Sequence, residues 1–165
     1  MTPGNSRRSV FLSYQHRDHD RARGFDLMWK SPHVDAKPSI RHLLDPAKST
    51  DAGYISKKIR EQIANTSVTI VLVGNDTHAS DWVAREIEWS LGKDHPNGIL
   101  AIRLDADATM PDALGDYAPE ILDWTQPLTL QAFEQAIERA ALRAGRGSRI
   151  ADSATASSGG PNCAR

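Results

Sequence analysis

Three short apolar runs, separated by segments with helical periodicity, constrain the fold of this 165-residue chain most strongly. They lie at residues 9–13, 68–73 and 99–104. Each run is too short for a buried helix and is bounded by polar residues, which is typical of a strand buried on both faces. Strands of this kind that alternate with helices predict a parallel sheet covered by helices.

Amphipathic helices are predicted between these strands. Ile55, Ile59 and Ile63 follow one another at steps of four residues, so they share one face of a helix over residues 54–64. The pattern also predicts a helix between Asp18 and Pro32, helices over 82–91 and 130–141, and a short strand over 121–124.

Two regions lack such periodicity. Residues 31–53 contain three prolines and no long periodic stretch, so we expect a loop with one short strand or helix. From residue 145 onward, small and polar residues replace the apolar pattern, which is typical of a disordered tail. The predicted organisation is one domain over residues 8–145 and a disordered tail over 146–165.

Composition excludes several classes of protein. With 20 basic and 21 acidic residues, the chain lacks the overall positive charge that attracts nucleic acid or anionic lipid. No apolar segment is long enough to span a membrane, and the N-terminal apolar run is too short for a signal peptide. The single cysteine, Cys163, fits a reducing cytoplasm, and we predict a cytoplasmic protein without nucleic-acid or membrane partners.

Metal and nucleotide-phosphate motifs are also missing from the sequence. The six histidines and the scattered acids show no metal-ligand spacing, so we predict no metal site. Neither the phosphate-binding loop of ATPases nor the glycine fingerprint of Rossmann domains occurs.

The segment Asp-Trp-Val-Ala-Arg-Glu at residues 81–86 is the most informative for function. It places the indole of Trp82 and the carboxylate of Glu86 four residues apart, on one face of a helix. The segment follows the strand at 68–73, so the pair would lie near the carboxyl end of a sheet, where open α/β folds bind ligands. A Trp at this spacing is more often a core residue, and the pair alone does not decide between the two interpretations.

Several motifs together resemble the Toll/interleukin-1 receptor (TIR) domain family. The resemblance is closest to its bacterial TIR-like branch, in particular to the TIR proteins of Thoeris anti-phage systems (ThsB type), and covers roughly residues 8–145. It implies a flavodoxin-like TIR fold, with a central parallel β-sheet flanked by helices in three α/β/α layers. The motifs are the apolar strand with Ser-Tyr at 10–14, the run 59–63, the segments 65–69 and 69–74, and residues 77–87, which include the Trp-x-x-x-Glu pair.

The resemblance implies roles for individual residues. Glu86 corresponds to the catalytic residue that breaks the nicotinamide–ribose bond of NAD, and Trp82 to a residue that shapes the same pocket. NAD is then a substrate, and no cofactor is expected. His78 precedes the helix and could touch the substrate, although a histidine in a loop more often makes local hydrogen bonds. The end of the first strand and the loop after it are expected to contribute to nucleotide binding, through Ser13, Tyr14, Gln15, His16 and Arg17.

The function implied is that of an NAD nucleosidase or ADP-ribosyl cyclase-type hydrolase of anti-phage defence. Its product would be a cyclic ADP-ribose-type or related signalling nucleotide that activates a separate effector. The residues leave cyclisation and plain hydrolysis open. Self-association and a phage-derived trigger are also expected from the family.

Two alternatives have the same general layout. A non-catalytic TIR-like adaptor would bind other proteins through its helices and loops. A phosphorylated receiver domain needs an acidic pair directly after the first strand, where this chain has Ser-Tyr-Gln-His at 13–16, so the sequence disfavours that alternative.

Overall fold

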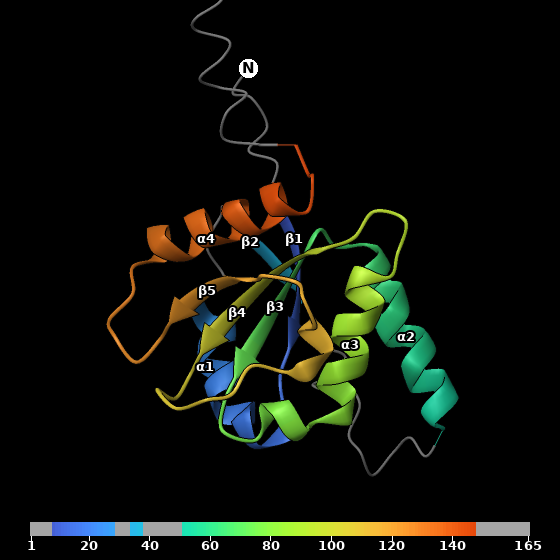
Figure 1. The fold of residues 1–165 in the computed structure, drawn as a ribbon, viewed down its shortest axis with the longest axis horizontal. Coiled ribbons are helices and arrows are strands. Elements are labelled where there is room, and N and C mark those ends of the chain that lie inside the picture. The colour runs from blue at the N-terminus through green and yellow to red at the C-terminus, as the bar shows by residue number, and fades with distance from the viewer. Residues whose placement is uncertain (1–7, 29–33, 38–50, 148–165) are drawn as a thin grey trace, which may run out of the picture.

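A computed structural model describes residues 8–28, 34–37 and 51–147 of the chain. These residues form one five-stranded sheet in the order β2-β1-β3-β4-β5, and all neighbouring strands are parallel (Figure 1). This is the strand order of flavodoxin-like folds. The predicted fold class is therefore confirmed.

The elements agree with the pattern predicted from the sequence. The short strand expected within residues 31–53 is β2, whereas residues 38–50 of that segment and 148–165 of the predicted tail lie outside the described residues. The strands are β1 (Arg8–Ser13), β2 (Val34–Lys37), β3 (Val68–Val73), β4 (Gly98–Arg103) and β5 (Glu120–Asp123). The helices are α1 (His19–Met28), α2 (Ala52–Ala64), α3 (Asp81–Leu91) and α4 (Leu130–Arg143), with short 3-10 turns η1 (His16–Asp18), η3 (Thr77–Ala79) and η4 (Asp112–Leu114).

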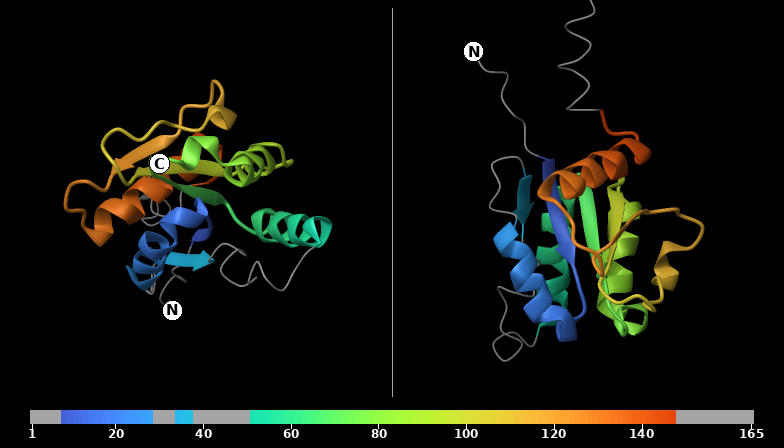
Figure 2. Two further views of the ribbon diagram at one scale, coloured as in Figure 1. Left: turned by 90° about the horizontal axis from the view of Figure 1, so that it is seen from below. Right: turned by 90° about the vertical axis from the view of Figure 1, so that its left-hand side faces the viewer.

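Helices cover both faces of the sheet, which gives three layers (Figure 2). Successive side chains of a strand point to opposite faces, so β1 and β3 contribute to both. On one face, Leu12 and Ile70 pack with Phe25 of α1 and Phe133 of α4. On the other face, the core is formed with α2 and α3 by Phe11, Ile59 and Ile63, and by Val71, Val83, Ile87 and Ile99.

Ion pairs attach α4 to β1 and β5. Arg8 donates two hydrogen bonds, of 3.0 and 2.8 Å, to the carboxylate of Glu138. Arg139 donates one of 2.6 Å to Glu120 on β5. Arg8 is only 5% exposed, and its bidentate ion pair with Glu138 offsets the free energy cost of removing its charge from water.

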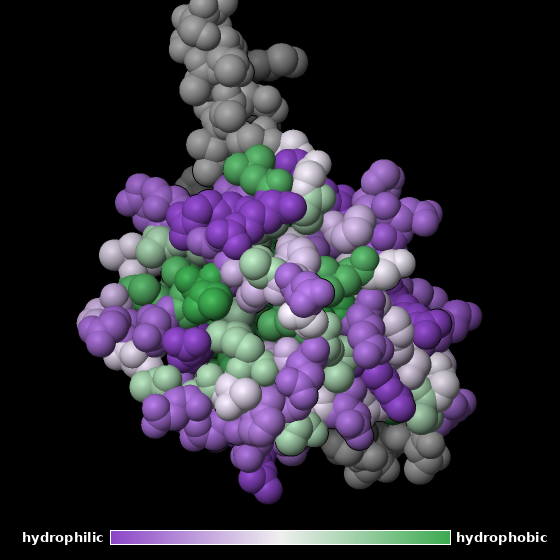
Figure 3. Space-filling view, viewed as in Figure 1, coloured by the Kyte–Doolittle hydropathy of each residue, from purple (hydrophilic) through white to green (hydrophobic). Residues whose placement is uncertain are grey.

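The surface is mostly hydrophilic on the face viewed in Figure 3, where hydrophobic side chains gather only in small separate groups. Isolated groups of this size are normal for a protein surface. In the described part of the chain, no helix combines the length and the apolar character needed to cross a membrane.

At Gly98, the first residue of β4, the backbone of α4 lies very close to the sheet. A Cβ atom at this position would lie 2.0 Å from the carbonyl oxygen of Ala140 and 2.4 Å from its carbonyl carbon. These are backbone atoms inside a helix, so they cannot rotate away as a side chain could. The packing of α4 on the sheet therefore requires glycine here.

We expect Gly98→Ala to lower the free energy of unfolding by about 3 kcal/mol, because α4 has to move away from the sheet. Urea denaturation measures the change. Gly24→Ala is the control, since Gly24 lies in α1 with nothing within 4 Å of an added Cβ, and alanine should stabilise that helix by up to about 1 kcal/mol. Equal unfolding midpoints for the two variants would contradict this account of the α4 contact.

Candidate functional site

The carboxyl ends of β1 and β3 lie side by side, and Ser13 is paired in register with Val71. The strand order changes direction here, because β2 is added on one side of β1 and β3 on the other. In parallel α/β sheets such a switch point is the usual place for a ligand. The loop after β3 leads through η3 into α3, which carries Glu86.

Glu86 lies in the second turn of α3 and points toward the sheet. Ser13, the last residue of β1, donates a hydrogen bond from Oγ to Oε2 of Glu86. Both side chains are fully buried, with exposed fractions of 0%. A buried carboxylate is stable only with hydrogen-bond donors, and Ser13 provides one from the neighbouring strand.

Local sequence explains where α3 begins and how it is oriented. Ser80 is the N-cap residue, and its side chain accepts a hydrogen bond of 3.4 Å from the amide of Val83. Val83 and Ile87, four residues apart, are both buried against β3 and β4. Glu86 therefore lies on the buried side of the helix, next to Ile87.

A chain of buried polar groups attaches the backbone of α3 to β3. Oγ of Ser90 donates to the carbonyl oxygen of Glu86 at 2.7 Å and lies 2.7 Å from Oγ1 of Thr69. Nδ2 of Asn97 donates to Thr69 at 3.0 Å and to Thr66 at 2.8 Å. Sequence reasoning missed these residues, although Thr69 interrupts an apolar run and Ser90 lies four residues after Glu86.

Trp82 lies one turn before Glu86 and is partly buried. Its indole packs with residues of α2, and the guanidinium of Arg85 lies 5.6 Å from its ring centroid. The prediction that Trp82 and Glu86 share a side of the helix is confirmed, but part of the indole belongs to the core between α2 and α3. That cluster contains Phe11, Ile55, Ile59, Ile63 and Trp89.

The other predicted residues near the end of β1 take different positions. Tyr14 is buried on the opposite face of the sheet, in the core with α1 and α4. Gln15 caps η1, because its Oε1 accepts a hydrogen bond of 2.6 Å from the amide of Arg17. His16 is exposed, with its ring 6.2 Å from that of His19. Of this group, Ser13 is the residue that the structure brings to Glu86.

Arg17 and His78 lie at the carboxyl edge of the sheet. Arg17 forms an ion pair of 2.9 Å with Asp76, in the loop after β3, and the two side chains are 75% and 51% exposed. A pair this exposed contributes little to stability, so the guanidinium is able to exchange partners. His78 is exposed in η3.

Asp18 is an acidic residue of this edge that the sequence did not indicate as special. Burial raises the pKa of its carboxyl group above the ordinary value, Arg21 opposes this shift, and the nearby carboxylates of Asp105 and Asp76 add to it. A side chain at Gly74 would collide with Asp18, since a Cβ there would lie 2.6 Å from Oδ2. Within the described residues, no group of three or more His, Cys, Asp or Glu side chains could hold a metal.

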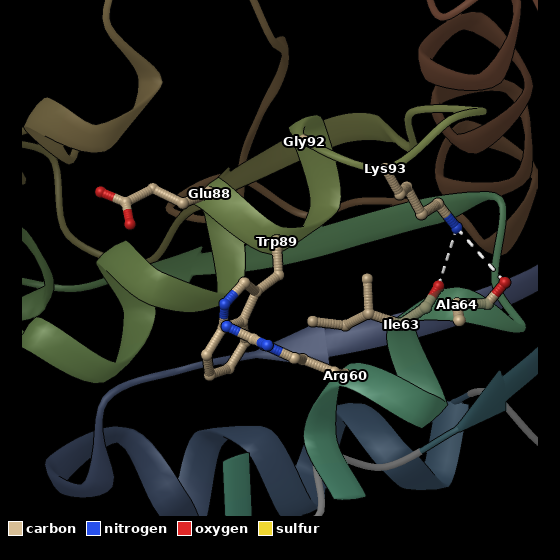
Figure 4. A pocket seen from close by; sticks show the side chains of 7 residues that line it. All are labelled: Arg60, Ile63, Ala64, Glu88, Trp89, Gly92 and Lys93. Carbon is tan, nitrogen blue, oxygen red and sulfur yellow. Dashed lines mark hydrogen bonds between the residues drawn. The ribbon is translucent and has the colours of Figure 1, made fainter. Parts of the chain in front are cut away.

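A pocket of about 230 Å³ lies between the C-terminal ends of α2 and α3, at the edge opposite the candidate site (Figure 4). Nζ of Lys93 donates to the carbonyl oxygens of Ile63 at 2.8 Å and Thr66 at 2.7 Å, and burial lowers the pKa of Lys93 to about 8. Arg60 stacks over Trp89 at 4.8 Å. Both helices present their carbonyl ends here, which disfavours an anionic ligand.

Comparison with known families agrees with this architecture. Residues 11–109 match the family model described as Thoeris protein ThsB, TIR-like domain. The chain belongs to this family. The match includes the second half of β1 with Ser13, the whole of α3 with Trp82 and Glu86, and β4.

A solved structure supports the fold of this TIR-like domain independently. The crystal structure of a conserved protein from Enterococcus faecalis V583 is similar, with a TM-score of 0.55 and 12% identity. The likeness covers 81% of this chain and 99% of the other. At this identity it shows the fold alone. No curated protein matches the chain.

We expect Ser90→Ala to destabilise this TIR-like domain by about 2 kcal/mol, because the variant loses the hydrogen bonds to Glu86 and Thr69 and leaves buried groups unsatisfied. Urea denaturation again gives the change. Ser56→Ala on α2 is a suitable control, since that side chain is partly exposed and the change should stay within about 0.5 kcal/mol. If the two variants unfold alike, the polar chain does not hold α3 on the sheet.

Proposed function

We propose that this TIR-like domain is an NAD-cleaving enzyme of anti-phage defence, in which Glu86 is the catalytic carboxylate. The observation that carries the proposal is the buried Glu86 side chain, held by Ser13 at the switch point of the sheet. The family match, which includes the Trp82 and Glu86 pair, supports it. We also propose that the protein acts in the cytoplasm.

The reaction needs a negative charge beside the ribose. When the bond between the nicotinamide nitrogen and the ribose carbon breaks, the electron pair leaves with nicotinamide, which departs as a neutral molecule. Positive charge then develops on the ribose carbon. A carboxylate in a site with little water stabilises this charge strongly, because few solvent dipoles screen it. Glu86 has both properties, since it is acidic and buried.

Access to Glu86 is part of the proposal. Its side chain has no exposed surface, so NAD reaches the carboxylate only when the groups that cover it move. Trp82 is partly exposed and one turn away, and its indole can then line the ribose pocket or stack on the pyridinium ring. Closure of such a site around substrate would exclude water.

The fate of the ribose carbon decides the product. Attack by water gives ADP-ribose and releases a proton. Attack by an atom of the same ADP-ribose unit gives a cyclic product that is lighter by one water, again with loss of a proton. We propose a cyclic ADP-ribose-type or related signalling nucleotide that activates a separate effector.

Self-association and activation by a phage component are part of this proposal. Among the described strands, β5 ends the sheet on one side, and Ile121 on this strand is 47% exposed. An edge strand with an exposed apolar residue is suited to pairing with another chain. Assays of the enzyme should therefore use high protein concentration.

We expect Glu86→Gln to reduce nicotinamide release from NAD by at least about 100-fold, because the variant keeps the shape of the side chain and removes its charge. Glu88→Gln is the matched control: Glu88 lies two residues further along α3, is exposed, and should retain full activity. Chromatography with mass spectrometry measures nicotinamide and the mass of the second product. Equal release by Glu86→Gln and the native chain would contradict the catalytic role.

The burial of Glu86 also favours a second function, that of a non-catalytic TIR-like adaptor. In that case the carboxylate serves only to join α3 to β1 through Ser13. The adaptor function predicts no nicotinamide release by the native chain, even in phage-infected cells. It also predicts that Glu86→Gln, whose amide oxygen still accepts from Ser13, keeps its stability and partner binding, whereas Glu86→Ala loses both together.

A further inference from the structure

Ser13 is an exception in the pattern of its strand. The other residues of β1 that are fully buried are apolar, namely Val10, Phe11 and Leu12. On the side facing α2 and α3, Phe11 packs in an apolar cluster, and Ser13 follows two residues later on the same side. An apolar residue would fill this position without a polar group to satisfy, so the hydroxyl needs a specific explanation.

The hydrogen bond to Glu86 gives that explanation. A serine hydroxyl has one O–H to donate. Ser13 donates it to Oε2 of Glu86 and is itself fully buried. While this bond exists, the same hydroxyl cannot donate to a nucleotide.

Glu86 is thereby fixed at two points. Its carboxylate is bonded to Ser13 on β1, and its carbonyl oxygen is bonded to Ser90, which contacts Thr69 on β3. β3 is the central strand of the five, and β1 is paired directly with it. Functional groups held by such supporting contacts are positioned more accurately than groups on loops.

We propose that Ser13 is a positioning residue that orients the Glu86 carboxylate and maintains its charge, and that it does not bind the nucleotide. The inference rests on the catalytic role proposed for Glu86. A donor to a carboxylate favours its ionised form, whereas burial opposes it. Loss of the Ser13 hydroxyl should therefore make Glu86 easier to protonate and less well oriented.

The other charged side chains on the elements around α3 either contact other groups or are at least partly exposed. Arg8, the one charged residue of β1, is bonded to Glu138 on the other side of the sheet, and β3 has no charged residue. On the remaining neighbours, Arg60 stacks on Trp89, Arg85 lies over Trp82, and Lys58 pairs with Glu61. Arg103 of β4 is partly buried, and the exposed titratable residues are Lys57, His78, Asp81, Glu88 and Asp112.

Steady-state kinetics of nicotinamide release test the proposal with three variants. Ser13→Ala and the near-isosteric Ser13→Cys should lower kcat about 10- to 100-fold and change KM by less than about threefold. The acid limb of the pH profile should move to higher pH in both. Ser13→Thr keeps the hydroxyl and should restore most of kcat. A raised KM with an unchanged kcat in Ser13→Ala would instead identify a nucleotide contact and overturn the proposal.

A second measurement does not depend on turnover. In protein labelled with ¹³C at the glutamate carboxyl carbons, the Glu86 resonance is identified by its loss in Glu86→Gln. We expect it to titrate at higher pH in Ser13→Ala and Ser13→Cys than in the native chain and Ser13→Thr. Urea denaturation checks that each variant is folded, and an unfolded Ser13→Ala leaves the comparison to Ser13→Cys.

These two measurements separate the proposals. An inactive native chain with a Glu86 titration that depends on Ser13 would refute the proposed enzyme and keep the coupling between the two residues. An active native chain whose Glu86 titration and kcat are the same in all folded variants would refute the role of Ser13 and keep the enzyme.

Discussion

The seating of α3 on the sheet depends on hydrogen bonds between buried polar groups as well as on apolar contacts. Val83 and Ile87 would pack at several rotations of the helix, because apolar contacts are not directional. The hydrogen bonds between Ser13 and Glu86 and between Thr69 and Ser90 have fixed partners on two strands. These bonds fix the rotation of α3 about its axis and its position along the sheet, and they thereby fix the position of the Glu86 carboxylate.

The sequence predicts the frame of the domain but not its internal polar contacts. Apolar runs such as 68–73 and the isoleucines of α2 indicate strands and helices because the periodicity is set by burial alone. The bond between Ser13 and Glu86 joins residues 73 positions apart and depends on β1 and β3 being neighbours. A serine at the end of a strand looks the same whether it binds a ligand or a side chain of its own protein.

Neighbouring residues at the end of β1 point to opposite faces of the sheet and so have different surroundings. Ser13 and Tyr14 follow one another in the sequence, yet Ser13 faces α3 and Tyr14 enters the core with α1 and α4. The sequence-based prediction assigns residues 13–17 together to one nucleotide site and does not separate the two faces. The alternation of strand side chains explains it, because consecutive positions point to opposite faces.

A catalytic carboxylate and a structural carboxylate have the same requirements in this position, because both must be buried and hydrogen-bonded. The two functions differ in whether they need the negative charge, whose burial costs free energy. A purely structural contact is satisfied by a neutral amide in place of Glu86, since an amide oxygen also accepts from Ser13. Burying a negative charge is unfavourable. A neutral amide, however, cannot stabilise the positive charge that develops in a reaction, whereas a carboxylate can. The acidic residue at this site therefore favours catalysis over scaffolding, even though Glu86 lies beneath the surface.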